Sequence, residues 1–238
     1  MYSTIVFDVN ETLLDLSALD PTFESHFGPG NFRKEWFSEV LKLAFVSTIV
    51  RDYSDFAVIG QAALEVLEKR HGKPCTEEER KKILSTMRRL PPHADVRGGL
   101  ETLKKRGFRL VALTNSTPST AEAQLTHAGI RNFFEVVFSA DTVKRLKPAV
   151  EPYEMIATSL SVAPNSLLMV AAHSWDIGGA IRAGLSGAFI ARPGQILDAL
   201  TSKPAFVASD LVDLARQIIQ RGKVELGKPQ ASGRKRLP

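Results

Sequence analysis

The sequence predicts an α/β protein: a Rossmann-like, doubly wound parallel sheet core with an inserted all-helical cap domain. Two observations carry this prediction. Apolar stretches of strand length alternate with helical stretches in the second half of the chain, and a block with helical periodicity alone follows the first apolar stretch. We therefore expect a core formed by residues 1–13 and 90–222, a helical cap at 14–89 and a basic, disordered tail at 223–238.

The first element is a short strand at residues 4–7 that leads directly into Asp8. Open α/β sheets place their ligands at the carboxyl ends of parallel strands, and a carboxylate held there can form an ester or acyl-phosphate. The alternative is an aspartate that only caps the following turn. Asn10 lies two residues further on, and an amide neither donates nor accepts a proton in catalysis near neutral pH.

The next block is predicted to be helical. Apolar residues recur at helical spacing over residues 33–49 and 54–71. A third helix is expected over residues 76–90, because it opens with the threonine and glutamate spacing of a capping box. Two prolines at 91–92 then end the block, which indicates a linker back to the core.

The rest of the core alternates between the two periodicities. Strands are expected at residues 109–114, 134–138, 166–171, 187–191 and 205–207, and helices at residues 96–106, 120–129, 152–160, 177–183 and 211–219. Strands separated by helices favour parallel pairing, because each helix returns the chain to the starting edge of the sheet.

Composition limits the class of protein. The 238 residues are 44% hydrophobic and 24% charged, which is ordinary for a globular protein with a proper core. We expect no membrane association and a cytoplasmic location, because the apolar runs are short and no signal peptide precedes the first strand. The single cysteine, Cys75, leaves no partner for an intrachain disulfide, and no Cys/His spacing indicates a zinc site.

The net charge of +5 lies in the tail. Residues 221–238 contain six basic side chains against one acidic side chain, so the rest of the chain is formally neutral. Nucleic-acid binding requires a basic patch on the folded body, and we therefore expect no nucleic-acid partner.

Three further polar motifs follow predicted strands: Thr114 with Asn115, then Lys147, then Asp176. Each has a structural explanation when taken alone. The first pair fits a polar turn, the lysine fits an exposed surface position, and the aspartate fits a helix N-cap. Their functional explanation depends on their occurrence together.

In this order and at these distances, Asp8, Thr114 with Asn115, Lys147 and Asp176 resemble the four motifs of the haloacid dehalogenase (HAD) superfamily. The resemblance covers nearly the whole chain except the tail, and the helical insert is similar to the cap of the type II branch. Further positions resemble the L-2-haloacid dehalogenase family in particular, namely Arg33, Phe56, Tyr153 and Trp175.

The resemblance implies hydrolysis of short-chain (S)-2-haloalkanoic acids to (R)-2-hydroxy acids through an aspartyl ester. Asp8 attacks the α-carbon, and water then hydrolyses the ester with help from Asp176. The implied catalytic residues are Asp8, Lys147, Asp176, Thr12 and Asn115, and the implied substrate- and halide-binding residues are Asn10, Arg33, Phe56, Thr114, Tyr153, His173 and Trp175. In this scheme Thr12 and Thr114 bind the substrate carboxylate, and Arg33 receives the halide.

Several positions depart from the family pattern. Asn10 and Glu11 stand where the dehalogenases usually carry Tyr-Gly, and Ala171 and His173 stand where they carry serine and asparagine. These changes alter the pocket wall and the hydrogen bonds around the nucleophile, so they bear on substrate range more than on reaction type. His173 fits either contact with a carboxylate or halide, or a purely structural hydrogen bond.

Two other functions remain open on the sequence. A HAD-type phosphatase or phosphonatase would need Mg²⁺, and Asn10 and Ala172 count against it. A non-catalytic small-carboxylate-binding protein would keep its affinity after Asp8→Asn. For the dehalogenase we expect no metal and no cofactor, a small 2-haloacid and water as reaction partners, and by resemblance a homodimer.

Overall fold

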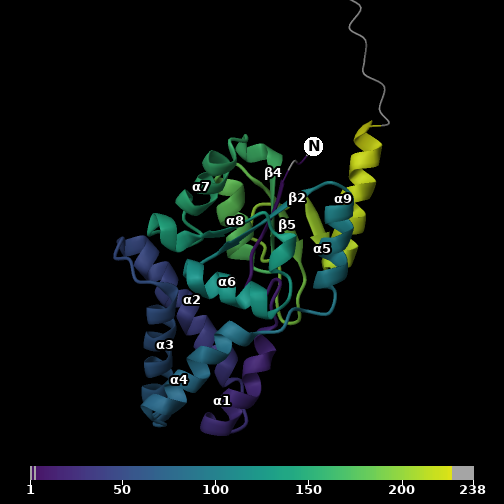
Figure 1. Ribbon diagram of the computed structural model, residues 1–238. Helices are drawn as coiled ribbons and strands as arrows, with labels where there is room; N and C mark the ends of the chain where they lie inside the picture. Colours follow the sequence, from purple (N-terminus) through teal and green to yellow (C-terminus); the bar gives the residue numbers. More distant parts are fainter. Residues whose placement is uncertain (1, 3, 227–238) are drawn as a thin grey trace, which may run out of the picture.

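One six-stranded sheet forms the centre of the protein, in the order β3-β2-β1-β4-β5-β6 (Figure 1). The computed structural model describes Tyr2 and residues 4–226, with side chains described up to Arg221. The strands are β1 (Thr4–Phe7), β2 (Arg109–Thr114), β3 (Val136–Ser139), β4 (Leu167–Ala171), β5 (Ser186–Ile190) and β6 (Phe206–Ala208). All five pairings are parallel, which confirms the predicted fold class.

The register of the central strands determines where the site lies. In β1, Phe7 pairs with Ala112 of β2 on one side and with Val170 of β4 on the other. The polar residues that follow these strands therefore leave the sheet at one edge and close together. This is the edge where parallel sheets bind ligands.

Alternate side chains of each strand enter two separate cores. Ile5 and Phe7 pack on one face with α5 (Val96–Lys105) and α9 (Leu211–Leu226). Val6 packs on the other face with α7 (Glu151–Leu160) and α8 (Ser174–Arg182). Strand side chains alternate in direction, so a sheet covered on both faces is apolar at nearly every position, as these strands are.

The chain between β1 and α5 folds into helices that lie beyond the carboxyl edge of the sheet (Figure 1). We call them the cap helices: η1 (Leu16–Leu19), α1 (Asp20–Phe27), α2 (Phe32–Val50), α3 (Phe56–His71), α4 (Glu77–Thr86) and η2 (Met87–Arg89). The α2–α3 pair is held by buried apolar side chains and by the Trp36 indole, which donates to Gly60 O at 2.9 Å. The division into cap and core at residues 14–89 stays a prediction.

The structure differs from the sequence prediction at several helix ends. The third cap helix ends at Thr86 and continues as the 3₁₀ turn η2, and α1 was not predicted as a separate helix. α6 (Pro118–His127) begins with its proline at a first-turn position, which a helix tolerates because that residue needs no amide donor. α8 begins at Ser174, three residues earlier than predicted, so Trp175 and Asp176 lie in its first turn.

The predicted start of the tail is wrong by four residues. α9 was expected to end near Ile219 but continues through Gly222 to Leu226. A glycine inside a helix costs only about 1 kcal/mol relative to alanine, which the flanking helix formers outweigh. The rest of the expected disordered tail, residues 227–238, lies outside the described residues.

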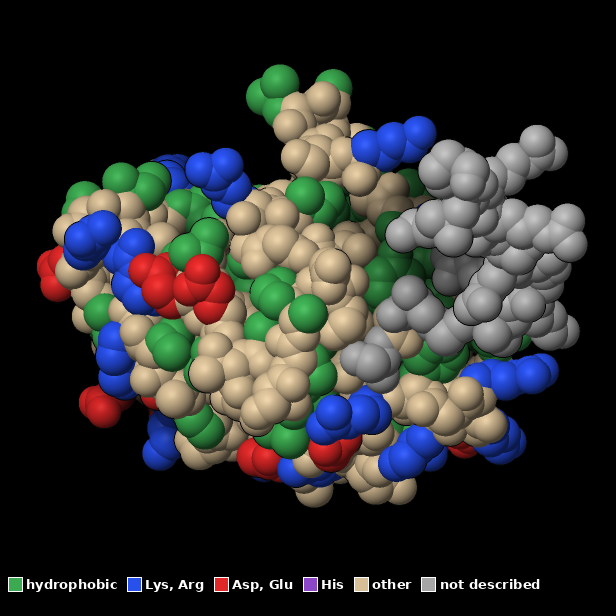
Figure 2. Space-filling model, turned by 90° about the horizontal axis from the view of Figure 1, so that it is seen from above, with side chains coloured by type: hydrophobic (Ala, Val, Ile, Leu, Met, Phe, Trp, Pro, Cys, Tyr) green, Lys and Arg blue, Asp and Glu red, His purple; other side chains and the backbone are tan. Residues whose placement is uncertain are grey.

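Two features of the described residues concern membrane crossing and nucleic-acid binding. Within residues 4–226, the structure contains no helix with both the length and the apolarity to cross a bilayer. Figure 2 shows the face away from the cap helices, where basic and acidic side chains of the described residues are interspersed around the rim. Mixed charge of this kind does not form the single basic field that steers nucleic acids.

Candidate active site

Asp8 is held at the end of β1 by two kinds of partner. Its backbone N–H donates to Val170 O at 3.0 Å, which continues the sheet pairing by one residue. Its Oδ2 accepts the Thr12 hydroxyl at 2.6 Å, and Thr12 Oγ1 in turn accepts the Ala172 N–H at 2.9 Å. Thr12 is fully buried and gives its single proton to Asp8. Thr12 therefore orients the Asp8 carboxylate. The expectation that Thr12 binds the substrate carboxylate stays a prediction.

Lys147 joins two carboxylates in a dry environment. Its Nζ donates to Asp8 Oδ1 at 2.8 Å and to Asp176 Oδ2 at 2.6 Å, and its third donor reaches Leu113 O at 3.1 Å. The ammonium is almost fully buried, which is tolerable only because all three donors are used.

Asn115 places the backbone of Lys147. Its Oδ1 accepts the Lys147 N–H at 2.8 Å, and its Nδ2 donates to Lys147 O at 3.4 Å. The carbonyl oxygen and the NH₂ group of the Asn115 side chain thus both bind the backbone of Lys147. Asn115 fixes the approach of the lysine and also lines the pocket in front of Asp8.

The pKa values of the two carboxylates that share Lys147 are shifted in opposite directions. Burial by itself raises the pKa of Asp8, but the charges of Lys147 and His173 and the hydrogen bond from Lys147 outweigh it and hold the pKa well below its usual range. Burial raises the pKa of Asp176, and the nearby charge of Asp8 adds to this against the attraction of Lys147. Burial lowers the pKa of Lys147, but the attraction of Asp176 and Asp8 is the larger effect. The pKa is therefore raised overall, and the side chain stays cationic. Asp8 is thus a permanent anion and Asp176 the more basic group.

Tyr153 supports Asp176 from behind. Its hydroxyl donates to Asp176 Oδ1 at 2.6 Å, and its ring is fully buried against α8. A Cβ at Gly179 would come within 2.8 Å of the Tyr153 hydroxyl oxygen, so glycine is required for this close approach. Tyr153 is not among the residues that line the pocket, and its hydroxyl positions Asp176. The expectation that Tyr153 contacts substrate stays a prediction.

His173 brings a second cation to the nucleophile. Its Nε2 is 2.8 Å from Glu11 Oε2, and its Nδ1 is 3.3 Å from Asp8 Oδ2, close enough for an ion pair but without hydrogen-bond alignment. Burial lowers the pKa of His173, but hydrogen bonding and charge from Asp8 and Glu11 outweigh burial and raise the pKa to about 9. At neutral pH the ring is an imidazolium stacked on Trp175, with ring centroids 5.0 Å apart.

Glu11 is a site residue that the sequence pattern did not identify. It adopts a left-handed conformation with φ of 61°, which costs a non-glycine residue about 1–2 kcal/mol. Its carboxylate accepts from His173 and, at 3.2 Å, from Gln195 Nε2. The sequence does contain an indication of this role. Glu11 stands where the family pattern has glycine, and His173, with which it pairs, stands where the pattern has asparagine.

Arg33 is held by two carboxylates. Its Nε and Nη2 donate to the two carboxylate oxygens of Asp20 at 2.8 and 3.3 Å, and its Nη1 lies 3.7 Å from Glu11 Oε1. Arg33 is not among the residues that line the nucleophile pocket. The expectation that Arg33 contacts the halide stays a prediction.

The nucleophile pocket itself is small, about 10 Å³, which is about the space of one water molecule. Eight of the predicted site residues meet on its wall. They are Asp8, Asn10, Phe56, Thr114, Asn115, Lys147, His173 and Trp175. Phe37 and Leu41 complete the wall and were not predicted, although they lie on α2 at helical spacing from Arg33.

Asn10 is fixed by two polar partners from α6 and the turn before it. Its Oδ1 accepts Gln124 Nε2 at 3.0 Å, and its Nδ2 lies 3.4 Å from Ser116 Oγ. Gln124 and Ser116 were not predicted as neighbours of the site. Because both ends of the amide are engaged, Asn10 acts as a fixed part of the pocket wall.

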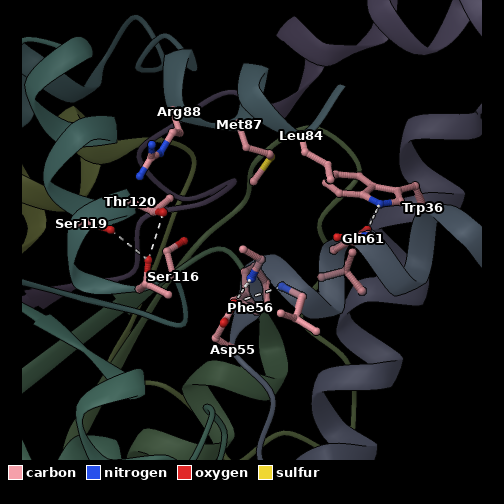
Figure 3. Close-up of a pocket in the computed structure, with 15 residues that line it drawn as sticks. Trp36, Asp55, Phe56, Gln61, Leu84, Met87, Arg88, Ser116, Ser119 and Thr120 are labelled. Carbon is pink, nitrogen blue, oxygen red and sulfur yellow. Dashed lines mark hydrogen bonds between the residues drawn. The ribbon is translucent and has the colours of Figure 1, made fainter. Parts of the chain in front are cut away.

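A larger cavity of about 430 Å³ lies next to the nucleophile pocket, between the cap helices and the start of α6 (Figure 3). Phe56 lines both spaces, and Ser116 lines the large cavity while contacting Asn10 of the small one. Asp55, the N-cap residue of α3, also lines this cavity. Its carboxylate accepts hydrogen bonds from the N–H groups of Ala57 and Val58.

The donor set is a poor fit for a magnesium ion. Asp8 and Asp176 both direct an oxygen at the Lys147 ammonium, and Ala172 supplies no side-chain oxygen. Across the part of the chain that the structure describes, no three His, Cys, Asp or Glu side chains come together as a metal site. Mg²⁺ prefers six oxygen ligands in octahedral geometry.

Comparison with known proteins was made on both sequence and structure. Residues 2–184 match the family model of the haloacid dehalogenase-like hydrolases. The chain is 26% identical to an (S)-2-haloacid dehalogenase of Pseudomonas sp. strain YL, covering 95% of this chain and 97% of the relative. It is 28% identical to haloacetate dehalogenase H-2 of Moraxella sp. strain B, over 85% and 91% of the two chains. The structure of L-2-haloacid dehalogenase from Xanthobacter autotrophicus superposes with a TM-score of 0.83 at 25% identity, covering 92% of this chain and 99% of that one.

Proposed function

The chain belongs to the haloacid dehalogenase-like hydrolases, and we propose that it hydrolyses the carbon–halogen bond of small (S)-2-haloalkanoic acids to give (R)-2-hydroxy acids. The observation that carries the proposal is the Asp8–Lys147–Asp176 cluster, with contacts of 2.8 and 2.6 Å, beside an amide at position 10. A phosphatase needs an acid two residues after its nucleophile to protonate the leaving alcohol, whereas a halide leaves without a proton. The relatives named as dehalogenases of 2-haloacids and haloacetate support the same reaction.

In the first step, an oxygen of Asp8 attacks the α-carbon of the substrate from the side opposite the halogen. A carbon–oxygen bond forms, the carbon–halogen electron pair leaves with the halide, and Asp8 becomes an uncharged ester that still carries the carboxylate of the substrate. The low pKa of Asp8, held down by Lys147 and His173 against its burial, keeps the nucleophile ionised. Thr12 fixes its direction, and the apolar wall formed by Phe37, Leu41 and Phe56 keeps bulk water from competing.

The halide and the substrate carboxylate need positive charge, and His173 supplies it in this chain. The imidazolium lies on the pocket wall, stacked on Trp175, whereas Arg33 is held by Asp20 and Glu11. Thr114 and Asn115 line the same wall with a hydroxyl and an amide that suit anion contacts.

In the second step, water attacks the carbonyl carbon of the esterified Asp8. Esterification removes the charge of Asp8, which leaves the Lys147 ammonium paired with Asp176 and frees one of its donors for the water. Asp176 accepts one water proton, as its raised pKa suits, and returns it to the alkoxide of the departing hydroxy acid. Asp8 is released as the carboxylic acid and loses the second water proton to solvent, because Lys147 and His173 hold its pKa low. Asn10 takes no part in this proton transfer.

Partners and location follow from the same proposal. The substrate is a small haloacid, and we propose a cytoplasmic enzyme that forms a homodimer. Support for the dimer comes from apolar side chains left exposed on α2 and α3: Val46, Ile49, Val50 and Val58. Sedimentation analysis at micromolar concentration tests it: a species of one chain mass contradicts the dimer.

The reaction is tested by halide release from (S)-2-chloropropionate, with and without EDTA, next to the Asp8→Asn variant. The proposal predicts halide in EDTA and none from the variant. Phosphate release from phosphoesters that needs Mg²⁺, without halide release, would move the chain to the phosphatases. If neither halide nor phosphate is released and the Asp8→Asn variant still binds carboxylates, the results would instead support a binding protein.

A further inference from the structure

We propose that the 430 Å³ cavity beside the nucleophile pocket is a subsite for a long C2 substituent of the substrate, and that it favours a substituent ending in a carboxylate. The inference rests on the proposed haloacid reaction and extends it to a substrate class: 2-halo acids with an apolar chain of several carbons and a second, distal acid group.

The available space supports an extended substrate. The nucleophile pocket holds about 10 Å³, enough for one water molecule, whereas the adjoining cavity falls in the 300–1,000 Å³ range of small-molecule sites. A substrate whose reacting carbon faces Asp8 has room to extend only where free volume exists. The cavity between the cap helices and α6 provides it.

The boundary between the two spaces consists of small or shared side chains. Phe56 lines both, and the Asn10 amide contacts Ser116 Oγ at 3.4 Å across the boundary. At 3.4 Å this contact is weak, so Ser116 can move aside while Asn10 keeps its 3.0 Å hydrogen bond from Gln124. A chain attached at the α-carbon can pass between Asn10 and Phe56 into the cavity.

The apolar side chains of the cavity wall come from the cap helices, and hydroxyl groups from the start of α6 face them. Figure 3 shows Trp36, Leu84 and Met87 along one side, facing Ser116, Ser119 and Thr120 on the other. Methylene groups of a substrate are stabilised by the apolar side. Hydroxyl groups opposite them suit a polar terminus.

Arg88 marks the polar end. Its guanidinium points toward the side of the cavity where Thr120 lies (Figure 3), and within the described residues it takes part in no ion pair. Asp55 is the acidic residue on the wall, and its carboxylate is occupied as the N-cap of α3. An arginine without an ion-pair partner, beside hydroxyl groups, is suited to a carboxylate.

The test is a substrate series: 2-bromopropionate, 2-bromohexanoate and 2-bromohexanedioate, with halide release as the readout. Each methylene that becomes buried raises kcat/KM by up to about fourfold, so we expect the hexanoate to exceed the propionate by at least tenfold. The distal carboxylate adds up to about fivefold through Arg88. A series that is flat or falls with length, with propionate still turned over, overturns the subsite and leaves the proposed reaction intact.

Matched variants locate the effect. Ser119→Phe fills the cavity and removes the advantage of the longer acids, whereas Ser119→Ala, which leaves the space open, keeps it. Arg88→Gln removes only the advantage of the diacid over the hexanoate. An unchanged ranking of the three acids in both Ser119→Phe and Arg88→Gln contradicts the proposal.

Binding of unreactive hexanedioate, measured by calorimetry, separates the subsite from the chemistry. Tighter binding of hexanedioate than of propionate, lost in Ser119→Phe, supports the subsite even if no acid in the series releases halide. Equal binding of the two overturns it.

Discussion

The core side and the cap side of the active site pair their charges differently. On the core side, Lys147 follows β3 and bridges Asp8, at the end of β1, and Asp176, in the first turn of α8 after β4. On the cap side, Arg33, the cation expected to receive the halide, is paired with Asp20. The cation beside the nucleophile is His173, which comes from the turn between β4 and α8 of the core.

This difference shows where a sequence motif predicts the contacts of a side chain and where it does not. On the core side, parallel pairing directs the segments that follow β1, β2, β3 and β4 to the same edge of the sheet, so the order of the motifs along the chain predicted these neighbours. A cap-side arginine can select among several carboxylates, and Glu11 and Asp20 decide its direction. The core side therefore carries the reaction, and the cap side adapts it to a substrate.

The largest expected effect comes from Asp8→Asn. The amide cannot form the ester, so we expect halide release to fall by about 10⁴-fold or more, because a nucleophile acts as a unit with its partners. Asp52→Asn, at an exposed position, is the matched control and should leave kcat unchanged. Substantial turnover by Asp8→Asn would contradict the role of the core side.

Lys147→Met tests whether the core side is also a structural unit. Two buried carboxylates lose their shared cation, so we expect about 10³-fold lower kcat and a free energy of unfolding reduced by about 3–5 kcal/mol. Urea unfolding alongside kinetics measures both. Wild-type stability in this variant would show that the cluster is not held by the charge of Lys147.

His173 makes the reaction dependent on pH. Its pKa is raised to about 9 by Asp8 and Glu11, so the imidazolium and the stability it contributes are fully present below the unfolded value of 6.5 and are lost as pH rises through about 9. We expect kcat/KM to fall above pH 9, and His173→Asn to lower it about 100-fold at pH 7 and remove this limb.

Glu11→Gln provides the matched control, because it keeps the side-chain size and removes the charge beside His173. The falling limb of kcat/KM should then move to lower pH. A limb that stays at pH 9 would show that Glu11 does not sustain the imidazolium.

Arg33→Gln is expected to have a smaller effect than His173→Asn, about tenfold in kcat/KM, because Arg33 acts on the pocket only through Glu11. Measuring both variants with the same haloacid ranks the two cations. If Arg33→Gln abolishes halide release while His173→Asn is mild, Arg33 turns into the pocket during the reaction and the cap-side comparison fails.

Tyr153→Phe should have the smallest effect. The tyrosine touches Asp176 and not the pocket, so we expect kcat to fall a few-fold with KM unchanged. A raised KM would place Tyr153 against the substrate.

The sequence was sufficient for the fold and for the core side of the site. Apolar strands end at Asp8, Thr114 and Ala171, and parallel pairing forces their neighbours to one edge. The sequence was not sufficient for contacts that depend on how helices pack. The Arg33–Asp20 pair joins two cap helices, and the Gln124–Asn10 bond joins α6 to the segment after β1. Spacing along the chain does not encode either contact.

Thr12 and Tyr153 show a second limit. Both were identified as site residues, but residue type alone did not distinguish contact with substrate from support of a catalytic carboxylate. Burial made the distinction, since both side chains are fully enclosed and each hydroxyl donates to a carboxylate.

The central claim, an ester formed on Asp8 without a metal, is tested most directly by a single turnover in heavy-oxygen water with EDTA and enzyme in excess over (S)-2-chloropropionate. The first oxygen of the product comes from Asp8 and the replacement oxygen from water. We therefore predict lactate without the label, and one heavy oxygen in the peptide that contains Asp8. Labelled lactate with an unlabelled Asp8 peptide would mean direct attack by water on the substrate and would contradict the account.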